Sequence, residues 1–363
     1  MDRIEEHDVD SIAVGAAVLG SGGGGDPYIG KLMAKQAIRK HGAVPLISVD
    51  EVPDDALIIP SAMMGAPAVM LEKLPNGSEP EHAFRALERH LDQTAYGVIP
   101  VEAGGLNSCI PIYTAATLGL PLVDADGMGR AFPELQMVTF SVAGVSSSPM
   151  VLCDEKGNLM ILETITNQWS EVLARTATVA MGLSSMLSLY CMNGRTLKYS
   201  AIRGTMSMTA EIGRRILHSN RSEQDPVTAV VEVTRGVRLF TGKIVDVTRD
   251  LTTGFVRGRV VIEGLEADKG STFDLEFQNE NLLGRKDGRP AAMTPDLITV
   301  LDLEMAFPIT TEGLKYGQRV VVVGMPCDSF WRTERGLEHV GPKYFGYDID
   351  YTPVEELAGG AAS

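Results

Sequence analysis

The chain reads ALIIP at residues 56–60, EPEHAFRALERHL at 79–91 and YGVIPV at 96–101. The first and last segments are short, apolar and rich in strand-forming residues, which predicts two buried strands. The middle segment places Phe84, Leu87 and Leu91 on one helical face, which predicts an amphipathic helix. Strands and helices that alternate at these lengths are typical of an α/β layer with a mostly parallel sheet.

The neighbouring segments extend this pattern. We predict strands at 44–49 and 121–126, and helices at 10–19, 27–40 and 108–118. The run 10–19 is apolar at almost every position, so periodicity does not separate helix from strand, but Asp10 as an N-cap and the alanine content favour a helix. Asp26 is a fitting N-cap with Pro27 at the first helical position, and Gly42 ends that helix.

A different pattern begins near residue 141. We predict short strands at 138–145, 150–154 and 158–165, helices at 169–190 and 207–218, and further strands at 238–248, 252–264, 271–279, 296–303 and 318–326. The predicted organisation is an α/β domain over 1–170 that carries the glycine-rich and aspartate-rich loops, then a helix pair plus a β-rich, barrel-like α+β domain over 171–355. A disordered tail is predicted over 356–363.

Composition restricts the classes of partner. With 32 basic and 47 acidic residues the net charge is −15, which argues against nucleic acid as a partner. No apolar run approaches the roughly 20 residues that cross a bilayer, and the acidic start lacks the basic region of a secretory signal. The four cysteines form no C-x-x-C pair, which argues against a disulfide framework. We expect a cytoplasmic protein without a membrane partner. The sequence leaves open whether the protein forms a homo-oligomer.

The most visible motif is GSGGGGD at residues 20–26. It satisfies G-x-G-x-x-G, and its free N–H groups could hold an anion because a helix begins just behind it. Its candidate substrate-binding residues are Gly22, Gly23, Gly24, Gly25 and Asp26. A turn for close backbone packing and a dinucleotide site are the alternatives. The dinucleotide interpretation requires a preceding strand, where we predict a helix.

Two further loops follow predicted strands at the sheet edge where α/β proteins bind ligands. In EAGGLNS (102–108), Glu102 offers an acid or base, Asn107 an amide or an ordinary N-cap, and Gly104 and Gly105 permit close backbone approach. Cys109 is a possible nucleophile because a helix N-terminus favours a thiolate, although most single cysteines are small core residues.

The second of these loops, VDADGMGRAFPEL (123–135), carries Asp124, Asp126, Arg130 and Glu134. These side chains could bind a divalent metal, organise a general base or form an ion-pair network. The six histidines form no paired ligand motif, so a histidine-rich zinc site is not indicated. The sequence does not determine whether the protein binds a cofactor. We expect both loops and the glycine run to converge around one pocket.

Several motifs together resemble the S-methyl thiohydantoin desulfurase family, formerly a family of unknown function. They are GSGGGGDPYIGK, MMGAPAVMLEKLPNG, PVEAGGLNS, GLPLVDADGMGRAFPELQM, PDLITVLD and PITTEGLKYGQRV, and the resemblance runs from about Asp8 to Asp350. It implies an amino-terminal α/β domain followed by a distinct carboxyl-terminal domain. The implied activity is hydrolytic removal of methanethiol from an S-methyl thiohydantoin to give a hydantoin. A nucleotide-binding enzyme and a non-catalytic partner subunit of a hydantoinase-like enzyme are the alternatives.

That chemistry needs a base for water, donors for the ring and an apolar pocket for the S-methyl group. Our hypothesis assigns the base to Glu102, Asp124 or Asp126. Asn107 and the glycine amides would position the ring, and Arg130 would hold a substrate carboxylate with two parallel hydrogen bonds.

Overall fold

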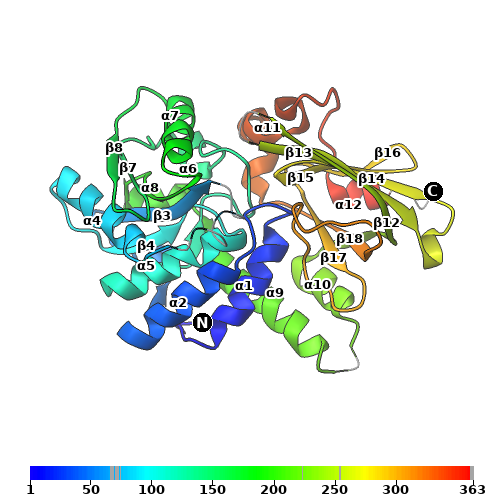
Figure 1. The fold of residues 1–363 in the computed structure, drawn as a ribbon, viewed down its shortest axis with the longest axis horizontal. Helices are drawn as coiled ribbons and strands as arrows, with labels where there is room; N and C mark the ends of the chain where they lie inside the picture. The colour runs from blue at the N-terminus through cyan, green and yellow to red at the C-terminus, as the bar shows by residue number, and fades with distance from the viewer. Residues whose placement is uncertain (66–68, 70–72, 74, 223, 253–254, 360–363) are drawn as a thin grey trace.

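The computed structural model describes residues 1–65, 69, 73, 75–222, 224–252 and 255–359 of the chain. Two parts lie side by side in Figure 1, an amino-terminal α/β part and a carboxyl-terminal β-rich part. The two-part architecture predicted from the sequence is therefore confirmed. Across the described residues, no helix combines the length and the apolar character needed to span a membrane.

The amino-terminal part is built on one mixed sheet. Its strands, in the described residues, are β1 (Arg3–Ile4), β2 (Val44–Ile47), β3 (Leu57–Gly65), β4 (Gly97–Pro100), β5 (Leu122–Val123), β7 (Met150–Cys153), β8 (Leu159–Leu162), β9 (Ser184–Ser188) and β10 (Met192–Asn193). The spatial order is β1-β2-β5-β4-β3-β9-β7-β8, and β10 also pairs with β3. The neighbours β2, β5, β4 and β3 are parallel, as predicted, and the flanking strands are antiparallel.

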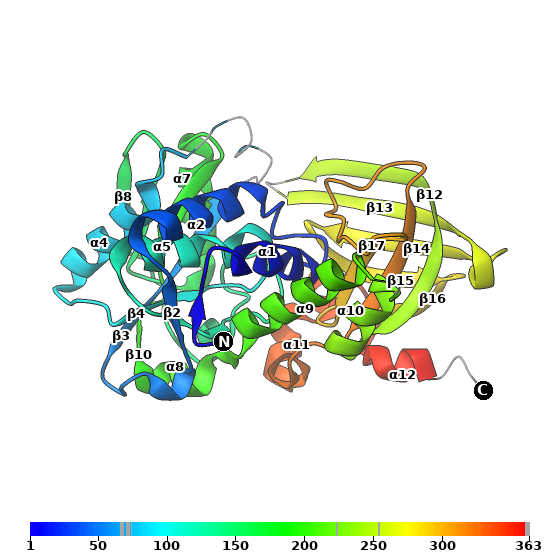
Figure 2. The same ribbon diagram turned by 90° about the horizontal axis from the view of Figure 1, so that it is seen from below.

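Helices cover both faces of this sheet (Figures 1 and 2). They are α1 (Asp8–Leu19), α2 (Tyr28–His41), α4 (Glu79–Leu91), α5 (Ile110–Leu118), α6 (Thr139–Val142), α7 (Asn167–Ala180) and α8 (Gly194–Ser200). The helices predicted near 10–19, 27–40, 79–91 and 108–118 are confirmed by α1, α2, α4 and α5. Phe84 and Leu87 of α4 are fully buried, as their spacing predicts.

Two predicted elements are wrong. The predicted strand at 138–145 is instead the short helix α6, because both the N–H and the hydroxyl of Thr139 bond to the carbonyl of Gly127 and Phe140 is fully buried beside Tyr190. The predicted helix over 169–190 ends at Ala180, and β9 follows it. Tertiary pairing decides this segment, since β9 lies between β3 and β7 and hydrogen-bonds to both.

The β-rich part follows a long helix, α9 (Thr205–Ser219), and α10 (Pro226–Thr234). Its antiparallel strands, in the spatial order β16-β15-β14-β13-β12-β18-β17, form a curled, half-barrel sheet (Figure 1). Their bounds are β12 (Val237–Thr252), β13 (Phe255–Gly264), β14 (Thr272–Gln278), β15 (Glu280–Lys286), β16 (Arg289–Met293), β17 (Leu297–Asp302) and β18 (Arg319–Met325). The barrel-like prediction is thus confirmed as a half-barrel.

The hairpin of β15 and β16 was not predicted. Asp287 and Gly288 both have positive φ at its turn, and an Asp-Gly pair is a recognised hairpin signal.

The remaining elements are the pair β6 (Ala125–Asp126) and β11 (Ile202–Arg203), the helices α11 (Glu334–Val340) and α12 (Val354–Gly359), and the 3₁₀ turns η1 (Val49–Glu51), η2 (Gly105–Ser108), η3 (Glu266–Asp268), η4 (Ser329–Arg332) and η5 (Pro342–Phe345). The predicted disorder is wrong for 356–359, which continue α12, while 360–363 lie outside the described residues.

The glycine-rich turn after α1 connects the two parts. Ser21 Oγ donates to the carbonyl of Ile298 and accepts from its N–H, at 3.0 and 2.9 Å. The Asn281 N–H donates to the Ser21 carbonyl at 2.7 Å, and the Thr311 N–H donates to the Gly22 carbonyl at 2.8 Å. Because each bond joins residues far apart in the sequence, this turn fixes the half-barrel against the α/β part.

Candidate active site

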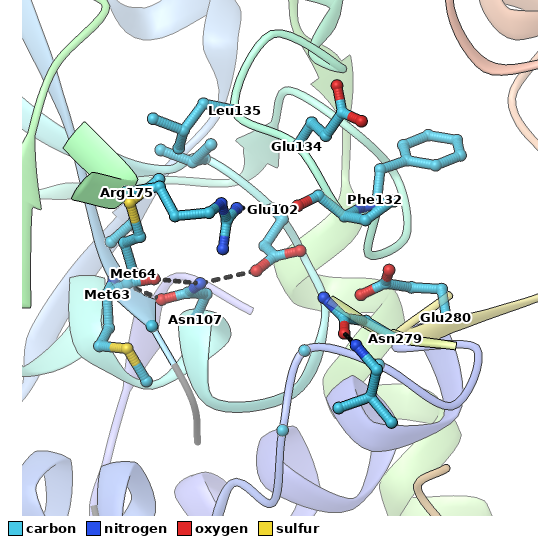
Figure 3. A pocket seen from close by; sticks show the side chains of 18 of the residues that line it. Met63, Met64, Glu102, Asn107, Phe132, Glu134, Leu135, Arg175, Asn279 and Glu280 are labelled. Atoms are coloured by element: carbon cyan, nitrogen blue, oxygen red, sulfur yellow. Dashed lines mark hydrogen bonds between the residues drawn. The ribbon is translucent and has the colours of Figure 1, made fainter. Parts of the chain in front are cut away.

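A pocket of about 270 Å³ lies where the two parts meet. The α/β part contributes the glycine turn, the ends of β3 and β4, the loop after β6 and α7, and the half-barrel contributes residues near β15 and the loop before β18 (Figure 3). The residues that matter below are Gly22, Gly23, Gly24, Gly25, Met63, Met64, Glu102, Asn107, Phe132, Glu134, Arg175, Glu280 and Glu312.

Glu102 is the most strongly perturbed acid in the pocket. Its Oε1 accepts a hydrogen bond from Asn107 Nδ2 at 2.6 Å, and its Oε2 is buried without a hydrogen-bond partner among the described residues. Burial raises the pKa of Glu102 to about 8, and the nearby charges of Glu280 and Asp126 act in the same direction. The side chain is therefore protonated over much of the neutral range.

Asn107 holds Glu102 rather than facing a ligand freely. Its Oδ1 accepts from the N–H of Met63 at 2.6 Å, and its Nδ2 donates to the carbonyl of Met63 at 3.1 Å. This pair of bonds to β3 fixes the amide so that its remaining N–H points at Glu102 (Figure 3). The sequence prediction that Asn107 helps to build the site is compatible with this geometry, but its contact is with Glu102.

Glu280 is a second pocket acid that sequence analysis missed. It begins β15 in the half-barrel, and its Oε2 is buried without a partner in the described part of the chain. Burial raises the pKa of Glu280 to about 7, which the charge of Arg130 and the N–H of Gly24 only partly oppose. The carboxyl group of Glu280 points toward that of Glu102 in Figure 3.

The glycine turn packs directly under these acids. A Cβ on Gly23 would overlap the carboxyl group of Glu280, and one on Gly24 would lie 2.8 Å from the carbonyl carbon of Gly104. Gly24 also accepts a hydrogen bond from the Leu106 N–H at 2.9 Å, which joins the two predicted glycine loops. The predicted convergence of 22–25 with 102–107 at one pocket is therefore seen in the structure, although Gly104 and Gly105 contact Gly24 rather than the pocket.

Asp126 lies behind the pocket rather than in it. The side chain is fully buried, and its Oδ2 accepts hydrogen bonds from the N–H groups of Ala103, Met128 and Gly129 at 2.7, 3.1 and 2.8 Å. Burial raises its pKa to about 7. Asp126 thus ties the loop after β6 to the segment that carries Glu102, and it is not among the residues that line the pocket.

Arg130 does not reach the pocket, contrary to the sequence prediction. It is fully buried, and its Nε and Nη1 donate to the carbonyls of Ala131, Pro295 and Asp296 at 2.9, 2.8 and 2.8 Å. Its guanidinium also lies 4.6 Å from the centre of the Phe132 ring. These bonds join the two parts of the molecule, and they leave this side chain unable to bind a substrate carboxylate.

Arg175 of α7 supplies the positive charge that lines the pocket instead. Its Nη2 donates to the Pro133 carbonyl at 3.2 Å, its Nε bonds to Glu171, and its guanidinium stacks 4.5 Å from the Phe255 ring of the half-barrel. The sequence signal was weak, because an arginine in a predicted helix is ordinarily a surface residue.

Two other predicted residues have structural roles. The Asp124 carboxylate accepts from the Ser207 N–H at 2.9 Å and from the Ser207 hydroxyl at 2.6 Å, so it stabilises the first turn of α9 outside the pocket. Cys109 is fully buried, and burial raises the pKa of its thiol to about 12. Of the two interpretations of Cys109, the structure therefore favours the small core residue, because burial disfavours the charged thiolate.

Glu134 and Asp26 lie at the edge of the site. Glu134 lines the pocket and accepts a hydrogen bond from the Tyr344 hydroxyl at 2.8 Å. Asp26 is exposed and accepts from the Tyr28 N–H at 2.9 Å, but the prediction that it is the N-cap is wrong, because α2 begins at Tyr28 and Pro27 takes the N-cap position. Its charge raises the pKa of the pocket residue Glu312, in addition to the larger effect of burial.

The rest of the wall is largely apolar. Ala62, Met63, Met64, Val101, Met128, Phe132 and Leu135 line it. The methionine pair inside PSAMMG thus lies beside the glycine turn. An apolar wall with two neighbouring acids suits a small ring that carries both polar atoms and an apolar substituent. Among the described residues, no group of three or more histidine, cysteine, aspartate or glutamate side chains is arranged to hold a metal ion.

The fold and the pocket define a two-part protein in which an α/β layer and a half-barrel enclose a pocket lined by two buried carboxyl groups. Family models for the S-Me-THD-like N-terminal and C-terminal domains match residues 7–164 and 165–354. The chain therefore belongs to the S-Me-THD-like family, the S-methyl thiohydantoin desulfurase family that its motifs resemble. Membership supports a thiohydantoin-related role.

A solved structure is also similar over nearly the full length. It is the X-ray crystal structure of a protein from Chromobacterium violaceum, with 25% sequence identity and a TM-score of 0.84, and the match covers 97% of this chain and 99% of that one. A comparison with curated proteins gave no match.

Proposed function

We propose that this protein is a hydrolase that removes methanethiol from an S-methyl thiohydantoin and leaves a hydantoin. The observation that carries the proposal is the pair Glu102 and Glu280, whose buried carboxyl groups share one pocket and have pKa values raised to about 8 and about 7. Near neutral pH such a pair holds a proton on one carboxyl and a negative charge on the other, which is the arrangement that acid–base hydrolysis requires.

The reaction balances with this pair. Ionised Glu280 takes a proton from water as the oxygen bonds to the ring carbon that carries sulfur, and protonated Glu102 gives its proton to the adjacent ring nitrogen. The tetrahedral intermediate then forms a carbonyl, its hydroxyl proton returns to Glu102, and the carbon–sulfur bond breaks. Glu280 gives its proton to the departing sulfur, so the products are hydantoin and methanethiol. The assignment follows the pKa order, since the carboxyl group with the higher pKa holds the proton.

The remaining lining supports the same substrate class. The thioether side chains of Met63 and Met64 offer a polarisable surface to an S-methyl group. We assign to Arg175, which lines the pocket and whose Nε bonds to Glu171, the binding of a carboxylate on a ring substituent, the role that the sequence suggested for Arg130. The negative charge of ionised Glu280 beside the glycine turn argues against a nucleotide, because phosphates would meet like charge.

The decisive experiment is thiol release by the purified protein alone. A panel of S-methyl thiohydantoins is incubated with the enzyme, and methanethiol and the hydantoin product are quantified. Glu102→Gln and Glu280→Gln should each lower kcat/KM by about 10²-fold or more if the pair supplies acid and base. Glu338→Gln, an exposed residue far along the chain, is the matched control and should leave turnover unchanged.

Each outcome has a distinct meaning. No thiol release from any member of the panel would favour the accessory-subunit alternative, and it would be followed by an assay with a hydantoinase-type enzyme added. Thiol release that survives both glutamine substitutions would overturn the assignment of Glu102 and Glu280 while leaving the reaction in place.

A further inference from the structure

Helix α7 buries small and polar side chains and exposes large apolar ones, which is the reverse of an ordinary surface helix. Its buried positions are small or polar, namely Ser170, Glu171, Ala174, Ala177 and Thr178. Its outer face, defined here as Trp169, Val172, Leu173, Thr176 and Val179, is exposed and mostly large and apolar. A helix of a globular protein normally directs its apolar stripe to the core, so in the part of the chain that the structure describes this face lacks the partner that its composition requires.

Neighbouring residues enlarge the same surface. Ile165, in the turn before α7, is 87% exposed, and Leu183, just after it, is 46% exposed. Met160 of β8 faces the same side of the sheet, since its cross-strand partner Leu152 packs in the core cluster that contains Ala174 and Ala177 of α7. The side chains of the outer face, together with Ile165, Leu183 and Met160, are on average about half exposed. Side chains of this size then present roughly 700 Å² of apolar surface, which is near the ~800 Å² that each partner buries in a standard interface.

The absence of charged side chains on the outer face of α7 indicates what kind of partner could cover it. Helix α7, all of which the structure describes, has only two ionisable side chains; Glu171 is buried and bonds to Arg175, and Arg175 lines the pocket. The outer face is therefore uncharged on a chain of net charge −15. Two such chains repel at most surfaces but can approach through an uncharged face. A membrane surface would instead require basic residues beside the apolar stripe.

We propose that the outer face of α7 is the interface of a homodimer, in which α7 packs against α7 of a second copy across a two-fold axis. In a two-fold dimer the same surface patch of both copies forms the contact. One apolar helix face that packs on the same face of a second copy meets this requirement. The interface borders the pocket, since Arg175, Thr178 and Val179 of the same helix line it. This inference is independent of the reaction proposed above.

The test is the molar mass of the full chain, measured by sedimentation equilibrium and by light scattering after size exclusion over roughly 1 to 100 µM protein. The wild-type protein should show a molar mass twice the 39.0 kDa of one chain. Val172→Glu places two like charges against each other across the axis, so the dimer dissociation constant should rise by at least about 100-fold. Tyr316→Glu, at a residue that is 74% exposed on the half-barrel side, is the control and should leave the dimer intact.

Trp169 provides a second readout in the unmodified protein. Of the two tryptophans, Trp331 is fully buried and Trp169 is half exposed, so dilution should shift the emission to longer wavelength as Trp169 becomes solvated. Trp169→Phe should abolish this shift. Circular dichroism and Tm confirm that each variant is folded. A monomer at every concentration overturns the proposal, and so does a dimer that persists in folded Val172→Glu.

Discussion

Glu102, just after β4 of the α/β layer, and Glu280, at the start of β15 of the half-barrel, each leave one carboxyl oxygen buried in the same pocket without a hydrogen-bond partner among the described residues. A buried polar atom without a partner is costly to a folded protein. Here two such atoms, from opposite parts of the molecule, lie where a ligand would sit. This relationship motivates the predictions below.

The pH dependence of turnover should follow the two carboxyl groups. Glu280 must be ionised, so kcat/KM should rise as pH increases through about 7, and Glu102 must be protonated, so kcat/KM should fall above about 8. The two limbs belong to the coupled pair rather than to single residues. In Glu102→Gln the residual activity should lose its alkaline limb. A flat wild-type profile between about pH 6 and about pH 9 would contradict the acid–base assignment.

Gly23→Ala should impair both stability and turnover. The new Cβ would occupy the position of the Glu280 carboxyl group, so either the turn or Glu280 must move. Overpacking of this kind costs about 1–3 kcal/mol in the free energy of unfolding, and kcat/KM should fall with it. Urea unfolding and the thiol assay measure the two effects. Gly359→Ala, where no described atom lies within 4 Å, is the control. Full activity in Gly23→Ala would show that Glu280 need not be held in place.

Asp124→Ala should separate stability from catalysis. This carboxylate accepts two hydrogen bonds from Ser207 in the first turn of α9, and loss of such a helix-terminal acceptor costs about 1 kcal/mol. We expect a lower Tm with kcat/KM unchanged within about 2-fold. A loss of turnover as large as that of Glu102→Gln would return Asp124 to the reaction.

Arg130→Met should destabilise the fold strongly. The carbonyls of Ala131, Pro295 and Asp296 would lose their donor inside the protein. Each buried acceptor that is left unpaired costs about 1–3 kcal/mol in the free energy of unfolding, which denaturant unfolding should detect. Arg221→Met, at an exposed arginine, should stay within about 0.5 kcal/mol of the wild type. Wild-type stability in Arg130→Met would show that these bonds contribute little.

Arg175→Met should alter substrate choice, given the reaction proposed above. If Arg175 binds a carboxylate on the ring substituent, KM for carboxylate-bearing S-methyl thiohydantoins should rise by about 10-fold or more, while uncharged analogues should change by less than about 3-fold. Initial rates on paired substrates measure the difference. An equal loss on both would indicate that Arg175 only supports the pocket wall through Pro133 and Phe255.

Local signals in the sequence predicted much of the fold. Helix α4 matches its predicted bounds because apolar spacing and flanking polar residues agree. The half-barrel strands β12, β13, β14, β17 and β18 were visible as apolar runs between turns. The failures lie at 138–145 and 184–188, where long-range bonds to Gly127, β3 and β7 override local preference. The Asp-Gly turn of β15 and β16 was a signal that went unused.

For the site, the sequence by itself determined that the loops at 102–108 and 123–135 follow strands of one α/β layer and that the glycine run follows a helix, because strand ends, helix ends and glycine turns are local features. It identified Glu102 and the run 22–25, which do line the pocket. Only the tertiary structure decided which acids meet. Glu280 reaches Glu102 through packing of the half-barrel on the glycine turn, and Asp124 and Arg130 are turned away to Ser207 and to backbone carbonyls. Burial and distance set charge, pKa and access, and both depend on contacts between residues far apart in the chain.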